Sequence, residues 1–254
     1  MRRFLFTIVG FVALLLVASP AYAPPPVLDH FKCYPIRETT SVSEFVELQD
    51  QFDTPNFEQV LVGLAVIFCN PSAKISSTGT FPINNPNNHL KMYLIHPGTP
   101  AQLPLTVANQ FGGQNLTVSS SVLLAVPTQK GTLPPPSGLD HFKCYPARVT
   151  PGAVNQPTFP ISVALMDQFD KAPEQVDVLR VVAFCNPTVK IHDGQTTTIQ
   201  NRLDHLACYV FRSTGRETNS PGLVHTNNQF GGEKFSVTRA RYLCVPTAKQ
   251  EISG

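Results

Sequence analysis

The octapeptide LDHFKCYP occurs twice without change, at residues 28–35 and at residues 139–146. Two looser copies alternate with them, NHLKMYL at 88–94 and LDHLACYV at 203–210. Recurrence of one segment in a fixed order is the sign of a repeat architecture, in which each copy begins one supersecondary unit. The chain is therefore predicted to contain four related units.

Two further elements complete each unit in the same order. The second is DQFD in units one and three and NQFGG in units two and four, and the third is an apolar stretch that ends in Pro-x-x-Lys. Alternating polar and apolar residues in the first element, and the β-branched, apolar third element, predict β-strands. The second element lies at 50–53, 109–113, 167–170 and 228–232, and the third at 68–74, 124–130, 184–190 and 243–249.

A proline-rich stretch, GTLPPPSG at 131–138, lies between units two and three and is typical of a linker. We therefore predict an all-β protein of two tandem lobes, 27–130 and 138–250. Each lobe would be a pseudo-two-fold barrel or sandwich of about six or more strands built from two repeats. A single four-bladed propeller is the alternative, because units of about fifty residues approach the length of propeller blades.

The first 23 residues have the form of a secretory signal peptide. Arg2 and Arg3 precede an apolar run at 4–18, and Ala-Tyr-Ala at 21–23 has the small-x-small pattern of a cleavage site. We expect a secreted or periplasmic protein, with no membrane span after the signal is removed. Without the two arginines, Lys plus Arg falls from 19 to 17 and equals the 17 Asp plus Glu. A net charge of zero gives no support to electrostatic capture of nucleic acid.

The composition fits a folded, loop-rich exported chain. Only 14% of its 254 residues are charged, and it contains 24 Pro, 15 Gly and 6 Cys. An even number of cysteines in an exported protein indicates disulfides. Unit two has Met92 and Ala125 where the other units have cysteines, and a joint loss is expected if the two positions are partners. The predicted pairs are Cys33–Cys69, Cys144–Cys185 and Cys208–Cys244.

Histidine and tyrosine recur at the same places of the first element in every unit. A polar residue kept in all four copies is more easily explained by the common fold, for example by hydrogen bonds to a neighbouring strand or loop, than by catalysis. The functional alternative is a multivalent binder that presents the His/Tyr/Lys face of the first strand. The candidate binding residues are His30, Tyr34, His89, Tyr93, His141, Tyr145, His205 and Tyr209.

Residues present in one copy only offer another route to function. His96, His192, Asp193 and His225 lie in turn-rich segments, where functional residues concentrate. No nucleophile, metalloprotease, EF-hand or phosphate-loop motif accompanies them, so no catalytic residue, cofactor or metal is assigned. An exported hydrolase would need these residues to converge in a cleft between the lobes. A metal-dependent binder would instead use the repeat histidines.

The linked motifs LDHFxCY, DQF and LCxPxxK resemble those of an uncharacterised family of exported bacterial proteins, classed as a domain of unknown function. The resemblance covers nearly the whole chain after the signal. It implies a bacterial, secreted or periplasmic protein and supplies no activity. The leading interpretation is therefore a non-enzymatic, disulfide-stabilised β-repeat protein, which acts as a structural or binding module for an unknown surface or extracellular partner.

Overall fold

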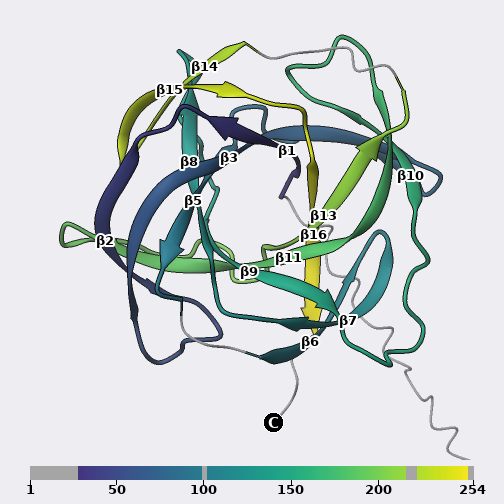
Figure 1. Cartoon of the computed structure of the whole chain (residues 1–254), viewed down its shortest axis with the longest axis horizontal. Coiled ribbons are helices and arrows are strands. Elements are labelled where there is room, and N and C mark those ends of the chain that lie inside the picture. The colour runs from purple at the N-terminus through teal and green to yellow at the C-terminus, as the bar shows by residue number, and fades with distance from the viewer. Residues whose placement is uncertain (1–27, 99–101, 216–221, 251–254) are drawn as a thin grey trace, which may run out of the picture.

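The structure, a computed structural model, describes residues 28–98, 102–215 and 222–250 as strands and loops without a helix (Figure 1). The all-β prediction is confirmed. The predicted signal peptide at 1–23 lies outside the described residues. The strands are β1 His30–Arg37, β2 Ser41–Gln49, β3 Glu58–Ser76, β4 Gly79–Phe81, β5 His89–His96, β6 Leu103–Asn109, β7 Gly112–Val118, β8 Leu123–Lys130, β9 His141–Val149, β10 Ile161–Met166, β11 Glu174–His192, β12 Gln195–Thr197, β13 His205–Ser213, β14 Leu223–Asn228, β15 Gly231–Val237 and β16 Tyr242–Gln250.

Eight of these strands close into a ring. Antiparallel pairing runs β1–β3–β5–β8–β9–β11–β13–β16 and returns from β16 to β1. Each unit supplies two ring strands, formed by its first and third elements, and strands of successive units also hydrogen-bond to each other. The four units thus surround one axis, as in the propeller alternative. They are joined edge to edge, however, whereas propeller blades are separate sheets.

Four arms lie outside the ring: β2, the hairpin β6–β7, β10, and the hairpin β14–β15. The second element of each unit directly follows β2 or β10, or forms the turn of a hairpin. In Figure 1, β2 and β10 lie at the left and right, and the two hairpins lie at the top and bottom. Each arm pairs with a ring strand of the opposite unit: β2 with β11, β10 with β3, β6 with β16, and β14 with β8. Units one and three therefore exchange contacts, as do units two and four.

Three apolar cores result from this arrangement. One lies on the ring axis, and two lateral cores lie between the ring and the arms. Each half of the sequence supplies the ring strands of one lateral core, but β6–β7 and β14–β15 pack in the core of the other half. The predicted lobes 27–130 and 138–250 consequently share the axial core, the exchanged hairpins and two hydrogen-bonded seams, β8–β9 and β1–β16. Closure of the ring favours this sharing, because it leaves no ring strand with an unpaired edge.

Strand β1 shows how the repeat places its residues. Phe31 and Cys33 point to the axial core, and Lys32 and Tyr34 lie on the other face beneath the arms. Both faces are buried, although the sequence alternates between polar and apolar residues. The polar side chains of this strand therefore need hydrogen-bond or ion-pair partners inside the protein, because a buried polar group without a partner is destabilising.

Candidate functional site

The four repeat tyrosines are buried and bind polar residues of the opposite unit. Tyr34 donates to Asp167 at 2.7 Å, and Tyr145 donates to Asp50 at 2.8 Å. Units two and four use asparagine instead: the Asn228 amide donates to the Tyr93 hydroxyl at 2.9 Å, and the Asn109 amide donates to the Tyr209 hydroxyl at 2.8 Å. The first residue of the DQF or NQF motif thus anchors an arm to the ring.

In units one and three, a buried lysine close to the tyrosine also binds residues of the opposite unit. Lys32 lies 2.9 Å from Asp170 and also contacts Glu174. In the reciprocal direction, Lys143 lies 2.7 Å from Asp53 and contacts Glu58. Pairing with carboxylates offsets the cost of burying these two lysines, because an isolated buried charge costs several kcal/mol.

Between the described residues of the second pair of opposite units there is only one such ion pair. Lys91 of unit two binds Glu233 of unit four. Unit four has Ala207 at the position of this lysine, and unit two has Gln114 at the position of this glutamate. Gln114 accepts a hydrogen bond from the Tyr209 hydroxyl at 3.2 Å. Both charges are thus missing together.

The repeat histidines are buried as well. The Nε2 atom of His30 forms a hydrogen bond with Gln110 Nε2 at 2.6 Å, and the Nε2 atom of His141 forms one with Gln229 Oε1 at 3.0 Å. Each of these histidines thus binds the glutamine of an NQF motif. His89 and His205 stack on Phe68 and Phe184, with ring centroids 5.6 and 5.5 Å apart.

Burial keeps all four histidines neutral at neutral pH. It lowers the pKa of His30 and His141 to about 4, and that of His89 and His205 to about 3. The eight predicted binding residues therefore do not form an exposed face: all are buried, and the arms cover them. The reason is that the polar side of the first strand faces the ends of the arms, rather than solvent.

The one-copy residues lie on three strands, β5, β11 and β14, and on the turn that follows β11. His192 contacts Glu44 at 2.6 Å and Asp193 at 3.7 Å. His96 lies opposite Leu61 in the sheet, and His225 lies opposite Lys234. No hydrogen bond or ion pair between described residues links the three histidines. Over the same residues, no group of three or more His, Cys, Asp or Glu is arranged to hold a metal ion.

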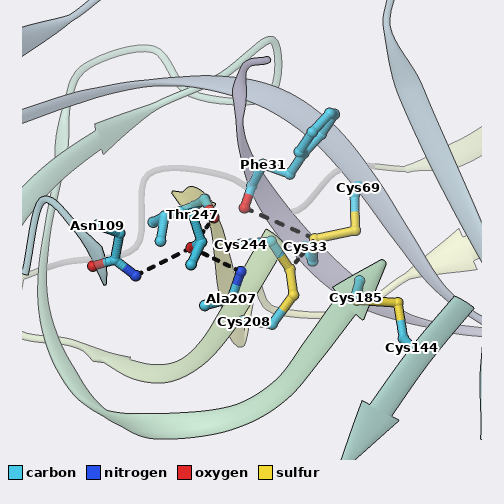
Figure 2. Close-up of a disulfide and its surroundings, with 11 residues drawn as sticks. Phe31, Cys33, Cys69, Asn109, Cys144, Cys185, Ala207, Cys208, Cys244 and Thr247 are labelled. Atoms are coloured by element: carbon cyan, nitrogen blue, oxygen red, sulfur yellow. Dashed lines mark hydrogen bonds between the residues drawn. A yellow bond between two sulfur atoms is a disulfide. The ribbon is translucent and has the colours of Figure 1, made fainter. Parts of the chain in front are cut away.

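The predicted disulfides Cys33–Cys69, Cys144–Cys185 and Cys208–Cys244 are present in the axial core (Figure 2). In each unit the two cysteines lie directly opposite each other on neighbouring ring strands, as do Met92 and Ala125 in unit two. Neighbouring disulfides touch, with Cys33 Sγ 3.9 Å from Cys244 Sγ. The centre of the molecule is therefore lined with sulfur.

An apolar pocket of about 200 Å³ opens at one end of this core. All eight ring strands contribute to its lining, and its inner wall includes five of the six cysteines and Met92. Four partly exposed residues at equivalent places, one from each unit, form its rim: Ile67, Leu123, Ala183 and Tyr242. The sequence patterns did not predict this pocket. Its signal is the residue that precedes Phe-Cys, Leu-Ala or Leu-Cys in every third element.

A second surface feature is an apolar strip on the outer face of β2, β3 and β5. Phe45 of β2 pairs with Leu61 of β3, which pairs with His96 of β5. Leu64 and Leu94 continue the strip along β3 and β5. Phe45 is 61% exposed, and Leu64 and Leu94 are 41% and 43% exposed.

The equivalent place on β10, β11 and β13 is a polar strip. Ser162 pairs with Asp177, which pairs with Arg212, in the same three-strand row. Ser162 donates to Asp177 at 2.8 Å, and Arg212 forms an ion pair with Asp177 at 3.1 Å. The Ser162 bond and this ion pair lower the pKa of the Asp177 carboxyl. Arg180 is found where the apolar strip has Leu64. One half of the protein therefore exposes apolar side chains where the other half exposes paired charges.

Comparison with known proteins gives one result. A family model described as "Repeat of unknown function (DUF7450)" matches residues 14–127 and 105–246. No curated protein and no solved structure matches. The described part of the chain contains no helix with the length and apolar character needed to cross a membrane.

Proposed function

Because the chain belongs to the family of DUF7450 repeats, whose description assigns no activity, we propose a function from the structure: an exported, disulfide-stabilised binding module. Its partner would be a protein that docks apolar side chains on the apolar strip of β2, β3 and β5. Three buried disulfides are typical of an oxidising environment outside the cytoplasm. They support the export that the signal sequence predicts.

The difference between the two strips is the observation that carries this proposal. Both strips have the same three-strand row, the same register and the same lateral position on the ring, so the fold does not require Phe45, Leu61 or Leu64 to be apolar. In the polar strip, serine, aspartate and arginine occupy the equivalent strand positions without a change in strand pairing. Contiguous exposed apolar residues mark interaction sites on soluble proteins.

A transplant of the polar strip tests the proposal. The variant Phe45→Ser/Leu61→Asp/His96→Arg gives the apolar strip the residues of its counterpart, so we expect stability within about 1 kcal/mol of the wild type. The control is Val154→Ser, which removes another exposed apolar side chain, located in the loop between β9 and β10.

The measurement is selection of a displayed random-peptide library on the immobilised wild-type protein, followed by titration of the selected peptides. We expect aromatic or aliphatic peptides whose affinity falls at least tenfold on the transplant and is unchanged on the control. If every selected peptide binds the transplant equally well, the strip is not the docking site. If sedimentation shows a dimer that only the transplant dissociates, the strip joins two copies of this chain and the proposed partner is wrong.

A further inference from the structure

The pocket at the end of the ring axis is a separate site, and it has the chemistry of a binding site for an apolar ligand. Its inner wall consists of disulfide sulfurs, the thioether of Met92 and aliphatic side chains. Of the two tyrosines in the lining, Tyr145 already donates its hydroxyl to Asp50. A charged ligand would lose its water in this pocket without gaining a counter-charge, at a cost of several kcal/mol.

The volume restricts the size of the ligand. A cavity of about 150 Å³ lined by aliphatic and aromatic residues stays dry and binds benzene. A pocket of about 200 Å³ accommodates one aromatic ring with a short substituent, or a branched aliphatic group of similar size. Sulfur makes favourable contacts with the edges of aromatic rings, and the wall of this pocket is unusually rich in sulfur.

The rim explains how such a ligand would enter. Three of the four equivalent rim residues are large: Ile67, Leu123 and Tyr242. Unit three has Ala183 at this place, and the lining extends there to Pro146 and Val182. Since Ile67 occupies the same strand position in unit one, the fold accepts a larger residue, and Ala183 keeps the pocket open on one side.

We propose that this axial pocket binds one small, uncharged, apolar ligand, with a single aromatic ring or a branched aliphatic group inserted beside the disulfides. The ring could belong to a free small molecule or to a side chain of a bound polypeptide. This proposal does not depend on docking at the apolar strip, because the two sites lie on different residues.

Methionine-methyl NMR provides a direct test. The chain has three methionines, of which Met92 lines the pocket and Met166 is exposed on β10. In protein labelled with ¹³C-methyl methionine, we expect toluene to shift the Met92 resonance in a saturable manner and to leave Met166 unchanged. Benzoate, which adds a charge to the same ring, should shift neither.

Two matched variants locate the effect. Ala183→Ile reproduces the rim residue of unit one and should weaken toluene binding at least tenfold. Ala108→Ile makes the same change on the exposed face of β6 and should leave binding unchanged. An unshifted Met92 resonance up to the solubility limit of toluene would overturn the proposal, and so would equal binding to Ala183→Ile.

The source of the ligand is distinguished by N-acetyl-phenylalanine amide, which presents the ring on a peptide backbone. Binding as tight as that of toluene indicates a side chain of a polypeptide. Binding of toluene alone indicates a free small molecule. Both outcomes support an apolar binding pocket, because in each the Met92 signal reports an inserted ring.

Discussion

The two pairs of opposite units are built from the same elements, yet they differ in how complete their contacts are. Units one and three are reciprocal: each has a disulfide, and each sends a buried lysine to two carboxylates of the other. Over their described residues, units two and four have one disulfide, within unit four, and one ion pair that joins the buried Lys91 to Glu233. The ring nevertheless closes through all four units.

The contacts missing from units two and four are missing in whole pairs. Met92 and Ala125 replace both partners of a disulfide, and Ala207 and Gln114 replace both partners of an ion pair. Physical chemistry explains this pattern, because one unpaired buried charge costs more than the loss of the pair. The polar residues of the repeat are therefore coupled through contacts between units, as expected of a framework.

The largest effect is expected when one partner of the ion pair in units two and four is removed. Lys91→Ala should lower the free energy of unfolding by roughly 3–5 kcal/mol, because it removes a fully buried side chain and leaves Glu233, which is only 17% exposed, without its counter-charge. Adding Glu233→Gln recreates the Ala207 and Gln114 combination and should recover most of the loss. Urea denaturation of the wild type, both single variants and the double variant measures the coupling. Additive losses would show that the two residues are not coupled.

A fourth disulfide should make unit two like the others. In Met92→Cys/Ala125→Cys the new cysteines lie directly opposite each other, as in the three natural pairs. Closing a loop of about thirty residues should raise the free energy of unfolding by roughly 3–4 kcal/mol. Intact mass should show the loss of two more hydrogens, and the melting temperature should rise. Ala125→Cys alone is the control; equal stability of the single and double variants would contradict the prediction.

A smaller effect is expected from acid titration of the histidines. The folded pKa of His89 is about 3, below its ordinary value of 6.5, because burial disfavours the charged form. Between pH 6.5 and pH 3, the unfolded chain therefore binds a proton at His89 that the folded protein does not bind. The stability present above pH 6.5 is lost as the pH falls toward 3. At pH 5 this loss is about 2 kcal/mol for one histidine.

The variant His89→Phe keeps an aromatic ring against Phe68 and removes this titration. The decrease in unfolding free energy between pH 7 and pH 5 should become smaller by about 2 kcal/mol. Any constant packing cost cancels in that difference. His225→Asn, a change on the exposed face of β14, is the matched control. An unchanged pH dependence in His89→Phe would show that His89 is accessible to protons in the folded state.

Much of the fold could be predicted because its signals are local or internal to the repeats. Alternation in the first element indicated strands, and the joint replacement of two cysteines by Met92 and Ala125 indicated the disulfides. The same logic applies to Ala207 and Gln114, but the sequence could not pair them. They lie in different units, and their contact depends on which arm crosses to which part of the ring.

The candidate sites show the same limit. The repeat histidines and tyrosines were recognisable as a set, but their burial depends on arms from other units. The apolar strip and the pocket rim each combine residues that are unremarkable alone. They become sites only when β2, β3 and β5 lie side by side, or when all eight ring strands meet at one axis.

The sequence by itself determined the repeat, the strand class, the disulfide pairs and the signal-like start, because each depends on short-range spacing or on comparison of the copies. Only the tertiary structure decided that the halves share one ring, that the polar face is buried, and that a pocket and an apolar strip are left open. These features arise from strand pairing between distant units, and the period-two pattern of a strand carries no information about which distant strand it will pair with.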